Sequence, residues 1–435
     1  MSLYASMNTA ISGLTAQARA LGNVADNVAN SQTTGFKRTD TSFVSYITKS
    51  TQQVNQPGSV IARPDYTLTV QGTVMPSDNP LAMAIAGQGM FSVSLPNGKE
   101  NGQTTFDPRN FYTRAGDFNM NKEGYLVNGQ GYYLQGWASD STGAPDRTSV
   151  QPLRVEQSAY NPVPTGNVDL KVYLPIDDPT GLVTKSFDIY DTVGGHHSVD
   201  VTFTKDTATP NQWAMSVVVP DDTSGVTART ITAQFGIGAS PDTPDGTLGA
   251  FDPLLAVDLT PTTAGAGMPA SVAFTADFGQ GPQSINLNFG EYGAASGLKQ
   301  YESGGKTDEV AQDGVPLGGF SSVSLTEAGD MMVNYDNGQS RTIGRVPIVS
   351  FADPDKLQKT DGQAFLRTPE SGDARVNDPS SNGSGKIVTS SLEGSNVDLA
   401  TEFSKLILAQ RAYSANTKIV TVSDELLQDT LNMRR

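Results

Sequence analysis

The 435-residue sequence contains no cysteine. This absence excludes disulfide bonds, thiolate zinc sites, iron–sulfur clusters and a cysteine nucleophile. Only two histidines are present, the adjacent His196 and His197, so almost every histidine-based mechanism would have to use that pair. Neighbouring residues of a strand point to opposite faces, so we expect a turn-flanking surface pair there and no metal site.

Charged residues are also scarce, at 17% of the chain, and the 29 basic residues are outnumbered by 45 acidic ones, which gives a net charge of −16. Nucleic acids and anionic membranes both require a basic footprint, so neither is expected as a partner. The sequence shows no basic segment followed by an apolar one at its start, and no apolar run of about 18 residues. We therefore expect neither a cleaved signal peptide nor a membrane span.

The charge that is present is distributed unevenly along the chain. Residues 1–35 hold one base and one acid, and residues 396–435 hold five of each. Residues 151–294, by contrast, hold 5 bases and 16 acids, a net charge of −11. Two neutral ends thus flank an acidic middle, which we interpret as a solvated outward surface.

Both neutral ends are predicted to be helical, because apolar residues recur there at alternating spacings of three and four. In residues 3–30 the seam is formed by Leu3, Met7, Ala10, Leu14, Leu21, Val24 and Val28. In residues 397–431 it is formed by Leu399, Phe403, Leu406, Tyr413, Val420, Leu427 and Leu431. Either helix alone could be an ordinary amphipathic core helix. Two such seams at opposite ends predict that the ends pair with each other and with other copies.

The middle of the chain is predicted to be rich in β-strands. Residues 168–174, 199–203 and 285–289 alternate apolar and polar side chains, as half-buried strands do. Explicit turns occur at residues 191–195, 121–124 and 336–338. The fold class is therefore multidomain α+β, mainly β, with terminal helices paired as a coiled coil and antiparallel sandwich- or barrel-like domains between them.

No catalytic, cofactor-binding or metal-binding motif is found. The Gly87–Gly89 segment lacks the third glycine of a dinucleotide fingerprint, and Gly385-Lys386 lacks the rest of a phosphate-binding loop. A calcium-like start at Asp117 has Lys122 where glycine is required and no glutamate at its end. We therefore predict a protein that is not an enzyme and has no cofactor and no small-molecule substrate.

The two ends carry a specific resemblance. Residues 21–43 and 393–431 resemble the N- and C-terminal motifs of the flagellar rod and hook family of axial proteins, and residues 80–93 and 111–137 resemble its core domain. Residues 188–205, 310–323 and 335–365 resemble the hook branch of that family. The motif positions are Asn23, Asn27, Asn30, Thr34, Gly35, Phe36, Gln410 and Arg411.

The resemblance implies a structural subunit of the bacterial flagellar hook. Such a subunit forms a flexible helical tube that transmits motor torque to the filament and surrounds the export channel. It implies export through the flagellar type III apparatus to an extracellular location, without a cleaved signal peptide. The implied partners are other copies of the chain, rod proteins, the hook cap, hook–filament junction proteins and flagellar export proteins.

Four regions are expected on this basis. They are a helical inner-tube domain (1–30 and 396–435), an extended connector (31–74 and 386–395), a β-rich core domain (75–153 and 295–385) and an inserted outer β domain (154–294). Two other functions remain open. One is a distal rod or other axial component, against which the large insert argues. The other is a secreted β-sandwich adhesin or carbohydrate-active enzyme, which would ordinarily show a signal peptide or a catalytic constellation.

Overall fold

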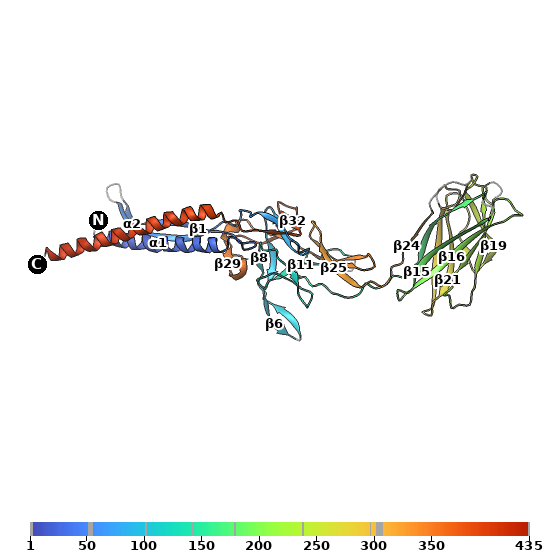
Figure 1. Ribbon diagram of the computed structural model, residues 1–435, viewed down its shortest axis with the longest axis horizontal. Coiled ribbons are helices and arrows are strands. Elements are labelled where there is room, and N and C mark those ends of the chain that lie inside the picture. The colour runs from blue at the N-terminus through green and yellow to red at the C-terminus, as the bar shows by residue number, and fades with distance from the viewer. Residues whose placement is uncertain are drawn as a thin grey trace. The chain divides into compact units, whose positions relative to one another are not determined.

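The computed structural model describes residues 3–50, 55–100, 102–140, 143–177, 180–236, 239–295, 297–301 and 308–433, and Figure 1 shows its ribbon. The chain divides into two compact units. Unit 1 comprises Met1–Gln157, Ser322–Asn334 and Ser340–Arg435, and unit 2 comprises Ser158–Ser321 and Tyr335–Gln339.

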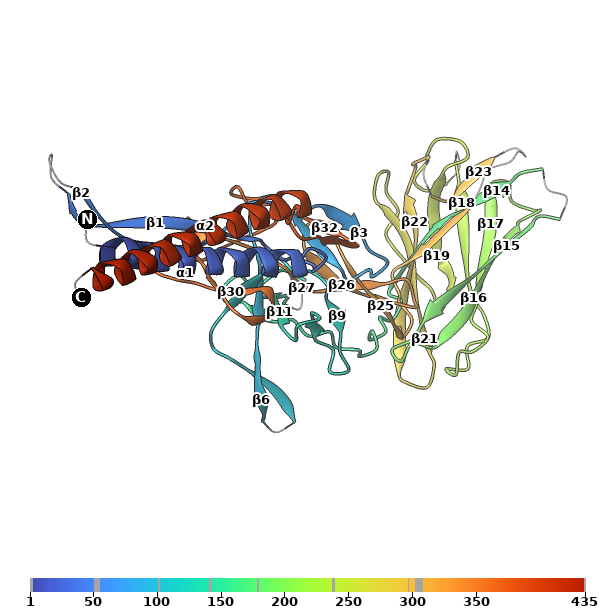
Figure 2. The ribbon, with the colours of Figure 1, turned by 60° about the vertical axis from the view of Figure 1, so that its left-hand side comes forward.

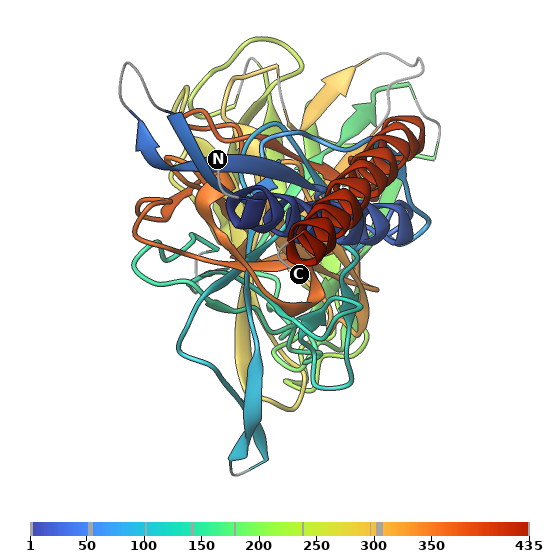
Figure 3. The same ribbon diagram turned by 90° about the vertical axis from the view of Figure 1, so that its left-hand side faces the viewer.

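Two long helices of unit 1 lie at the ends of the chain. Helix α1 is Leu3–Ala29 and helix α2 is Leu399–Asn432, so the two predicted helices are confirmed. The helices pack antiparallel, because the end of α1 lies beside the start of α2, where Asn27 bonds Glu402. Farther along the pair, Gly13 of α1 lies against Asn416 of α2. Figure 3 shows the two helices side by side, as the predicted coiled coil requires.

A long antiparallel hairpin covers another side of α1. Its strands are β1 (Thr39–Ser50) and β2 (Asn55–Tyr66). Two hydrogen bonds fix it to the helix: the Thr9 hydroxyl donates to the carbonyl of Gly58 at 2.8 Å, and the Val60 N–H donates to the Ser12 hydroxyl at 3.2 Å. The 31–74 part of the expected extended connector therefore contains a hairpin packed on α1.

The β-rich part of unit 1 is built around an antiparallel sheet of eleven strands among the described residues, in the main order β25-β26-β27-β11-β5-β8-β30-β29. Strands β9, β10 and β12 extend it, and two 3-10 turns lie at Pro354–Lys356 and Asp361–Gln363. The strands are β3 (Val74–Pro76), β4 (Met83–Ala86), β5 (Phe91–Ser94), β6 (Pro96–Glu100), β7 (Gln103–Phe106), β8 (Phe111–Thr113), β9 (Asn119–Met120), β10 (Leu126–Val127), β11 (Tyr133–Ala138), β12 (Gln151–Pro152), β25 (Phe320–Leu325), β26 (Asp330–Tyr335), β27 (Ser340–Arg345), β28 (Ile348–Ser350), β29 (Gln358–Lys359), β30 (Ala364–Leu366), β31 (Arg375–Asn377), β32 (Lys386–Thr389) and β33 (Ser391–Glu393).

Unit 2 contains two five-stranded sheets that share one apolar core, and Figure 2 shows its strands. The sheet orders are β20-β21-β22-β13-β24 and β15-β16-β17-β18-β19. The strands are β13 (Asn167–Lys171), β14 (Tyr173–Pro175), β15 (Leu182–Tyr190), β16 (His196–Lys205), β17 (Gln212–Val218), β18 (Arg229–Phe235), β19 (Leu248–Val257), β20 (Thr260–Pro261), β21 (Pro269–Asp277), β22 (Pro282–Glu291), β23 (Lys299–Tyr301) and β24 (Glu309–Gln312).

The alternating segments fall on strands of unit 2 whose side chains alternate between core and solvent, as predicted. Two details differ from expectation. The pairs β13·β22 and β14·β23 are parallel, and each joins strands more than a hundred residues apart. The return to unit 1 was expected near residue 295, whereas β24 still pairs with β13, so unit 2 continues to Ser321.

Candidate assembly site on the terminal helices

Small side chains lie where α1 meets α2. Ala20 of α1 and Ala409 of α2 line the same groove between the helices, and they are 7% and 6% exposed. At Gly13, an added Cβ would lie 3.0 Å from Nδ2 of Asn416. Small side chains let two helix backbones approach closely.

The structure places the predicted seam residues as follows. Ala10 and Val24 are buried, whereas the other described α1 seam residues are half-buried, namely Met7, Leu14, Leu21 and Val28. On α2 the half-buried seam residues are Leu406, Val420 and Leu427, and the exposed ones are Leu399, Phe403 and Tyr413. The side chains of Leu3 and Leu431 lie outside the described part of the structure. In a single copy the seam of α2 is therefore more exposed than the seam of α1.

A second apolar stripe on α2 was missed by the sequence reasoning. It follows the same three-and-four spacing, two positions further along, as Leu408, Ala412, Ala415, Ile419, Val422 and Leu426. Its large members are exposed, with Leu408 at 67% and Val422 at 51%. Only the first seam was predicted, although the spacing of this second stripe can also be read in the sequence.

A groove runs between α1, α2 and the β1 strand, with a volume of about 490 Å³. Leu408 and Ala412 of the second stripe line one wall, and Phe43 of β1, which is 46% exposed, lines another. The remaining lining residues are Gln17, Ala20, Asn23, Val24, Thr39, Asp40, Thr41, Lys405 and Ala409. The helical pair therefore presents both ridges and a groove to its surroundings.

Polar side chains close the base of the helical pair. Asn27, 1% exposed, donates from Nδ2 to the Thr39 carbonyl and to Oε2 of Glu402, both at 3.0 Å, and its Oδ1 accepts the Thr39 N–H at 2.9 Å. Lys405 forms ion pairs with Glu402 at 2.8 Å and with Asp40. Burial works against the charge of Lys405, yet the two carboxylates raise its pKa. One motif asparagine thus joins α1, β1 and α2.

The other motif residues after α1 shape the chain reversal. Asn23 donates to the Thr41 hydroxyl at 2.8 Å, and Asn30 donates to the Asp26 carbonyl at 2.9 Å near the helix end. Thr34 is half-buried. Its neighbour Gly35 has a φ of 69°, a region that favours glycine, and a Cβ there would lie 2.4 Å from the Ala115 nitrogen.

Phe36 completes the N-terminal motif. It is 1% exposed, and the ammonium of Lys359 lies 4.6 Å from its ring centroid. On α2, the motif residues Gln410 and Arg411 are exposed, and the structure gives no reason for them within one copy. The N-terminal motif therefore serves the fold of the chain, while this part of the C-terminal motif faces outward.

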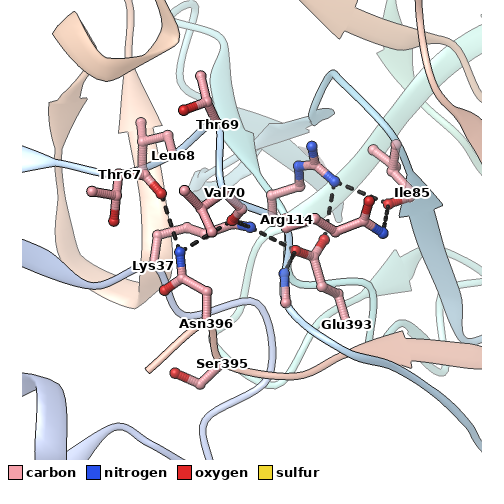
Figure 4. Close-up of polar contacts among 12 residues, drawn as sticks. Lys37, Thr67, Leu68, Thr69, Val70, Ile85, Arg114, Glu393, Ser395 and Asn396 are labelled. Atoms are coloured by element: carbon pink, nitrogen blue, oxygen red, sulfur yellow. Dashed lines mark hydrogen bonds and ion pairs between the residues drawn. The ribbon is translucent and has the colours of Figure 1, made fainter. Parts of the chain in front are cut away.

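The sequence reasoning also missed a buried ionic cluster, which Figure 4 shows in close-up. Glu393, fully buried, pairs with Lys37 at 2.6 Å and with Arg114 at 3.0 Å, and it accepts the Gly72 N–H at 2.8 Å. Burial lowers the pKa of both Lys37 and Arg114, although Glu393 opposes that shift. One carboxylate thereby ties together the segments after α1, after β2, on the core sheet and before α2.

Asn396 adds a second tie three residues later. Its Oδ1 accepts the Arg38 N–H at 2.8 Å, and its Nδ2 donates to the carbonyls of Thr67 and Val70, both at 3.1 Å. Lys37 donates to the same Val70 carbonyl at 2.6 Å. A signal for this cluster was available, because Lys37 and Glu393 are residues of opposite charge within the two motif segments.

The two histidines at the start of β16 differ in their surroundings. His197 stacks on Phe278 with ring centroids 3.9 Å apart, and its nitrogens lie 3.4 Å from Asp191 and 3.2 Å from Asp221. His196 is exposed. Within the described residues no group of three or more histidines, aspartates or glutamates is placed to hold a metal ion. Neither described helix is long and apolar enough to cross a membrane.

Comparison with known proteins agrees with this architecture. Four family models match: "Flagella basal body rod protein" at residues 7–37, "Flagellar hook protein FlgE/F/G D1 domain" at 84–172, "Flagellar basal body protein FlaE D2 domain" at 163–315 and "Flagellar basal body rod FlgEFG protein C-terminal" at 388–433. These matches and the paired terminal helices define an axial protein of the bacterial flagellum.

Relatives in several bacteria specify the branch. The chain is 32% identical to the flagellar hook protein FlgE of Brucella abortus and 25% identical to that of Escherichia coli, with 100% and 98% of this chain and 100% and 99% of the relatives covered. A crystal structure of the Helicobacter pylori flagellar hook protein FlgE2 matches with a TM-score of 0.46 and 15% identity over 72% of this chain and 98% of that one. The chain belongs to the flagellar hook protein family, and a rod subunit is not favoured.

Proposed function

We propose that the chain polymerises through its terminal helices into the flexible helical tube of the flagellar hook. The observation that carries this proposal is that small side chains of the helices are buried while several large apolar ones are exposed. Ala20 and Ala409 are buried where α1 meets α2, while Phe403 and Leu408 stay exposed. Exposed apolar stripes at helical spacing are best covered by further helices, and in a homopolymer neighbouring copies supply them.

The same polymer accounts for the contrast in charge between the ends and the middle. Apolar helix contacts at the neutral ends would hold an inner tube together. Unit 2, with 6 basic and 19 acidic residues in 158–321, would face outward, where wet polar contacts exchange partners at low cost. A tube built in this way bends as it rotates and still transmits torque along its inner layer. It would also surround the export channel.

The partners and location follow from family membership as proposals. The chain would join rod proteins at one end and hook–filament junction proteins at the other, and it would meet the hook cap during growth. It would reach the flagellum through the flagellar type III apparatus. We infer a structural role without catalysis, cofactor or small-molecule substrate.

The test is polymer growth from purified protein on sheared hook fragments, observed by electron microscopy. Full-length chain is expected to grow short curved tubes, and a variant lacking residues 1–30 and 397–435 is expected to grow none. Leu408→Lys should block growth, because it places a charge in the exposed stripe of α2. Gln428→Lys on the same helix is the matched control, since Gln428 is already exposed and polar, and it should grow normally. Growth by the truncated chain would refute assembly through the helices.

A further inference from the structure

Five asparagines of this chain are each followed directly by glycine. Glycine has no Cβ, so its backbone nitrogen can approach the side chain of the preceding residue closely. An asparagine carboxamide can react with that nitrogen, and how readily it does so depends on what holds the two groups. The structure describes four of the pairs, which begin at Asn97, Asn128, Asn337 and Asn382, and the fifth asparagine, Asn101, lies outside the described residues.

The pair Asn382-Gly383 lies in the loop between β31 and β32, and both residues are exposed. Within the described part of the chain the Gly383 N–H has no hydrogen-bond partner, and a Cβ on Gly383 would meet open space. The Asn382 carboxamide makes one long hydrogen bond there, from Nδ2 to Oδ1 of Asn377 at 3.3 Å. Both reacting groups of this pair are therefore accessible and weakly held.

The pair Asn337-Gly338 is held at both groups. The Gly338 N–H donates to the Tyr335 carbonyl at 3.2 Å. The Asn337 Nδ2 donates to the Pro316 carbonyl at 2.9 Å, and its Oδ1 accepts the Gln339 N–H at 3.0 Å. A reaction between the two groups would first have to break these hydrogen bonds.

The pair Asn128-Gly129 is restrained in the same way. The Gly129 N–H donates to Oδ2 of Asp117 at 3.2 Å, and Oδ1 of Asn128 accepts the Gln130 N–H at 3.1 Å. Asn128 is also only 5% exposed. Asn97 lies within strand β6, where pairing with β7 restrains the backbone. Asn382 is therefore the least restrained of the described pairs.

We propose that Asn382 is a site of spontaneous deamidation. The backbone nitrogen of Gly383 attacks Cγ of Asn382, the bond from Cγ to Nδ2 breaks, and the proton of the attacking N–H leaves with the nitrogen as ammonia. The product of this step is a succinimide ring. Water then adds to either carbonyl of the ring and opens it, which leaves aspartate or isoaspartate at position 382. The reaction needs water alone, and it does not depend on polymerisation.

The modification would release the loop from β31. Nδ2 of Asn377 donates to the Ser350 hydroxyl at 3.1 Å and to the Arg375 carbonyl at 3.3 Å, so Oδ1 of Asn377 is held towards residue 382. A carboxylate at position 382 has no N–H to donate to that oxygen, and two acceptors would then face each other. The loop would lose its hydrogen bond to Asn377 and gain a negative charge.

The test compares the pairs within one folded protein. Purified full-length chain is incubated in buffer, and mass spectrometry of its peptides measures aspartate and isoaspartate at positions 382, 337 and 128 over time. Position 382 is expected to convert at least about tenfold faster than the other two, because their hydrogen bonds must break before the ring can close. The same incubation in urea unfolds the chain, and the three rates should then become similar. Equal rates in the folded chain would overturn the proposal, and so would an unchanged ratio in urea, because the neighbouring sequence and not the fold would then set the rate.

A variant tests the effect on the loop. Asn382→Asp reproduces one product of the reaction, and Asn97→Asp is the control, since it adds the same charge at an exposed position of β6. Hydrogen exchange is measured at the N–H groups of Ser380 and Ser384, which donate to the carbonyls of Gly385 and Ser381 within the loop. Exchange should become severalfold faster in Asn382→Asp and stay unchanged in Asn97→Asp. Unchanged exchange in both variants would overturn the release of the loop.

Discussion

Unit 2 and the helical pair of unit 1 handle their large apolar side chains in opposite ways. In unit 2, Phe203, Trp213 and Phe289 are fully buried in one core shared by both sheets. On α2, Phe403 is 52% exposed and Leu408 is 67% exposed. Burying such a side chain stabilises a fold by about 1.5–3 kcal/mol. Unit 2 obtains that stabilisation within one copy, whereas α2 leaves much of it ungained in a single copy.

The first prediction tests the buried side of this comparison by creating a cavity in the core of unit 2. Phe203→Ala is expected to destabilise unit 2 by about 3–5 kcal/mol, because it removes a buried ring beside Phe289 and leaves a cavity. Trp213 lies in unit 2 and Trp137 in unit 1, so a Trp137→Phe background isolates the fluorescence of unit 2 during urea unfolding. A loss below about 1 kcal/mol would show that unit 2 is loosely packed.

The second prediction concerns the buried ionic cluster that joins the helices to the core. Glu393→Gln leaves Lys37 and Arg114 buried with no counter-charge, and removing one partner of a buried pair costs about 3–5 kcal/mol. We expect the lower end of that range, because Gly72 and the neighbouring carbonyls still bond the side chains. Hydrogen exchange of α2 should rise accordingly.

The matched control is Glu309→Gln, which removes an ion pair to Lys171 in which both side chains are more than half exposed. Exposed pairs contribute about 0–1 kcal/mol, so this variant should unfold like the unaltered chain. If the two variants lost equal stability, the cluster would be no more than a surface contact, and its role in joining four segments would be wrong.

Most of the secondary structure that could be predicted followed from the periodicity of apolar side chains in the sequence. Both helices and the strands β13, β16 and β22 follow from side-chain spacing, because spacing reports directly which face is buried. The pairing of β24 with β13 could not be read, because it depends on contacts between segments about 140 residues apart. The hairpin β1–β2 was missed for a related reason. It packs on α1 through contacts between residues about 50 positions apart in the sequence.

The two helices that carry the candidate site were predicted, whereas their contacts were not. The assembly role of the seams stays a prediction, and a seam says nothing of which neighbour it meets. In the structure Ala20 and Ala409 are buried where the two helices meet, and Phe403 is 52% exposed. Glu393 was read as part of a motif and not as a buried charge, because burial of a charged residue depends on partners such as Arg114, which lies 279 residues away.

The third prediction uses pH to weaken unit 2 without altering a side chain. Burial alone would raise the pKa of Asp222, but hydrogen bonds from Arg229 and from the N–H groups of Asp277 and Ser224 lower it to about 2. Its pKa in the unfolded chain is near the ordinary value of 3.8. The folded state therefore gains stability that is fully present above about pH 4 and is lost as pH falls towards 2, by roughly 2 kcal/mol.

This contribution is measured by following Trp213 fluorescence in urea at pH 5, 4, 3 and 2.5, again with Trp137→Phe. Asp222→Asn cannot ionise, so the variant should start less stable at pH 5 and lose less stability than the parent between pH 4 and 2.5. Parallel curves for parent and variant would assign the acid sensitivity of unit 2 to other carboxylates.

The fourth prediction has the smallest expected effect on a single copy, because it changes an exposed apolar side chain of α2. Phe403→Ser should change the free energy of unfolding of the monomer by less than about 0.5 kcal/mol, because the ring is already 52% exposed and makes little use of the core. The same change should raise the protein concentration needed for polymer growth severalfold. Growth is measured on sheared hook fragments and unfolding by urea, with Thr401→Ser on the exposed surface of the same helix turn as the control. A variant that loses monomer stability while growing normally would reverse the comparison, since Phe403 would then serve the subunit and not the assembly.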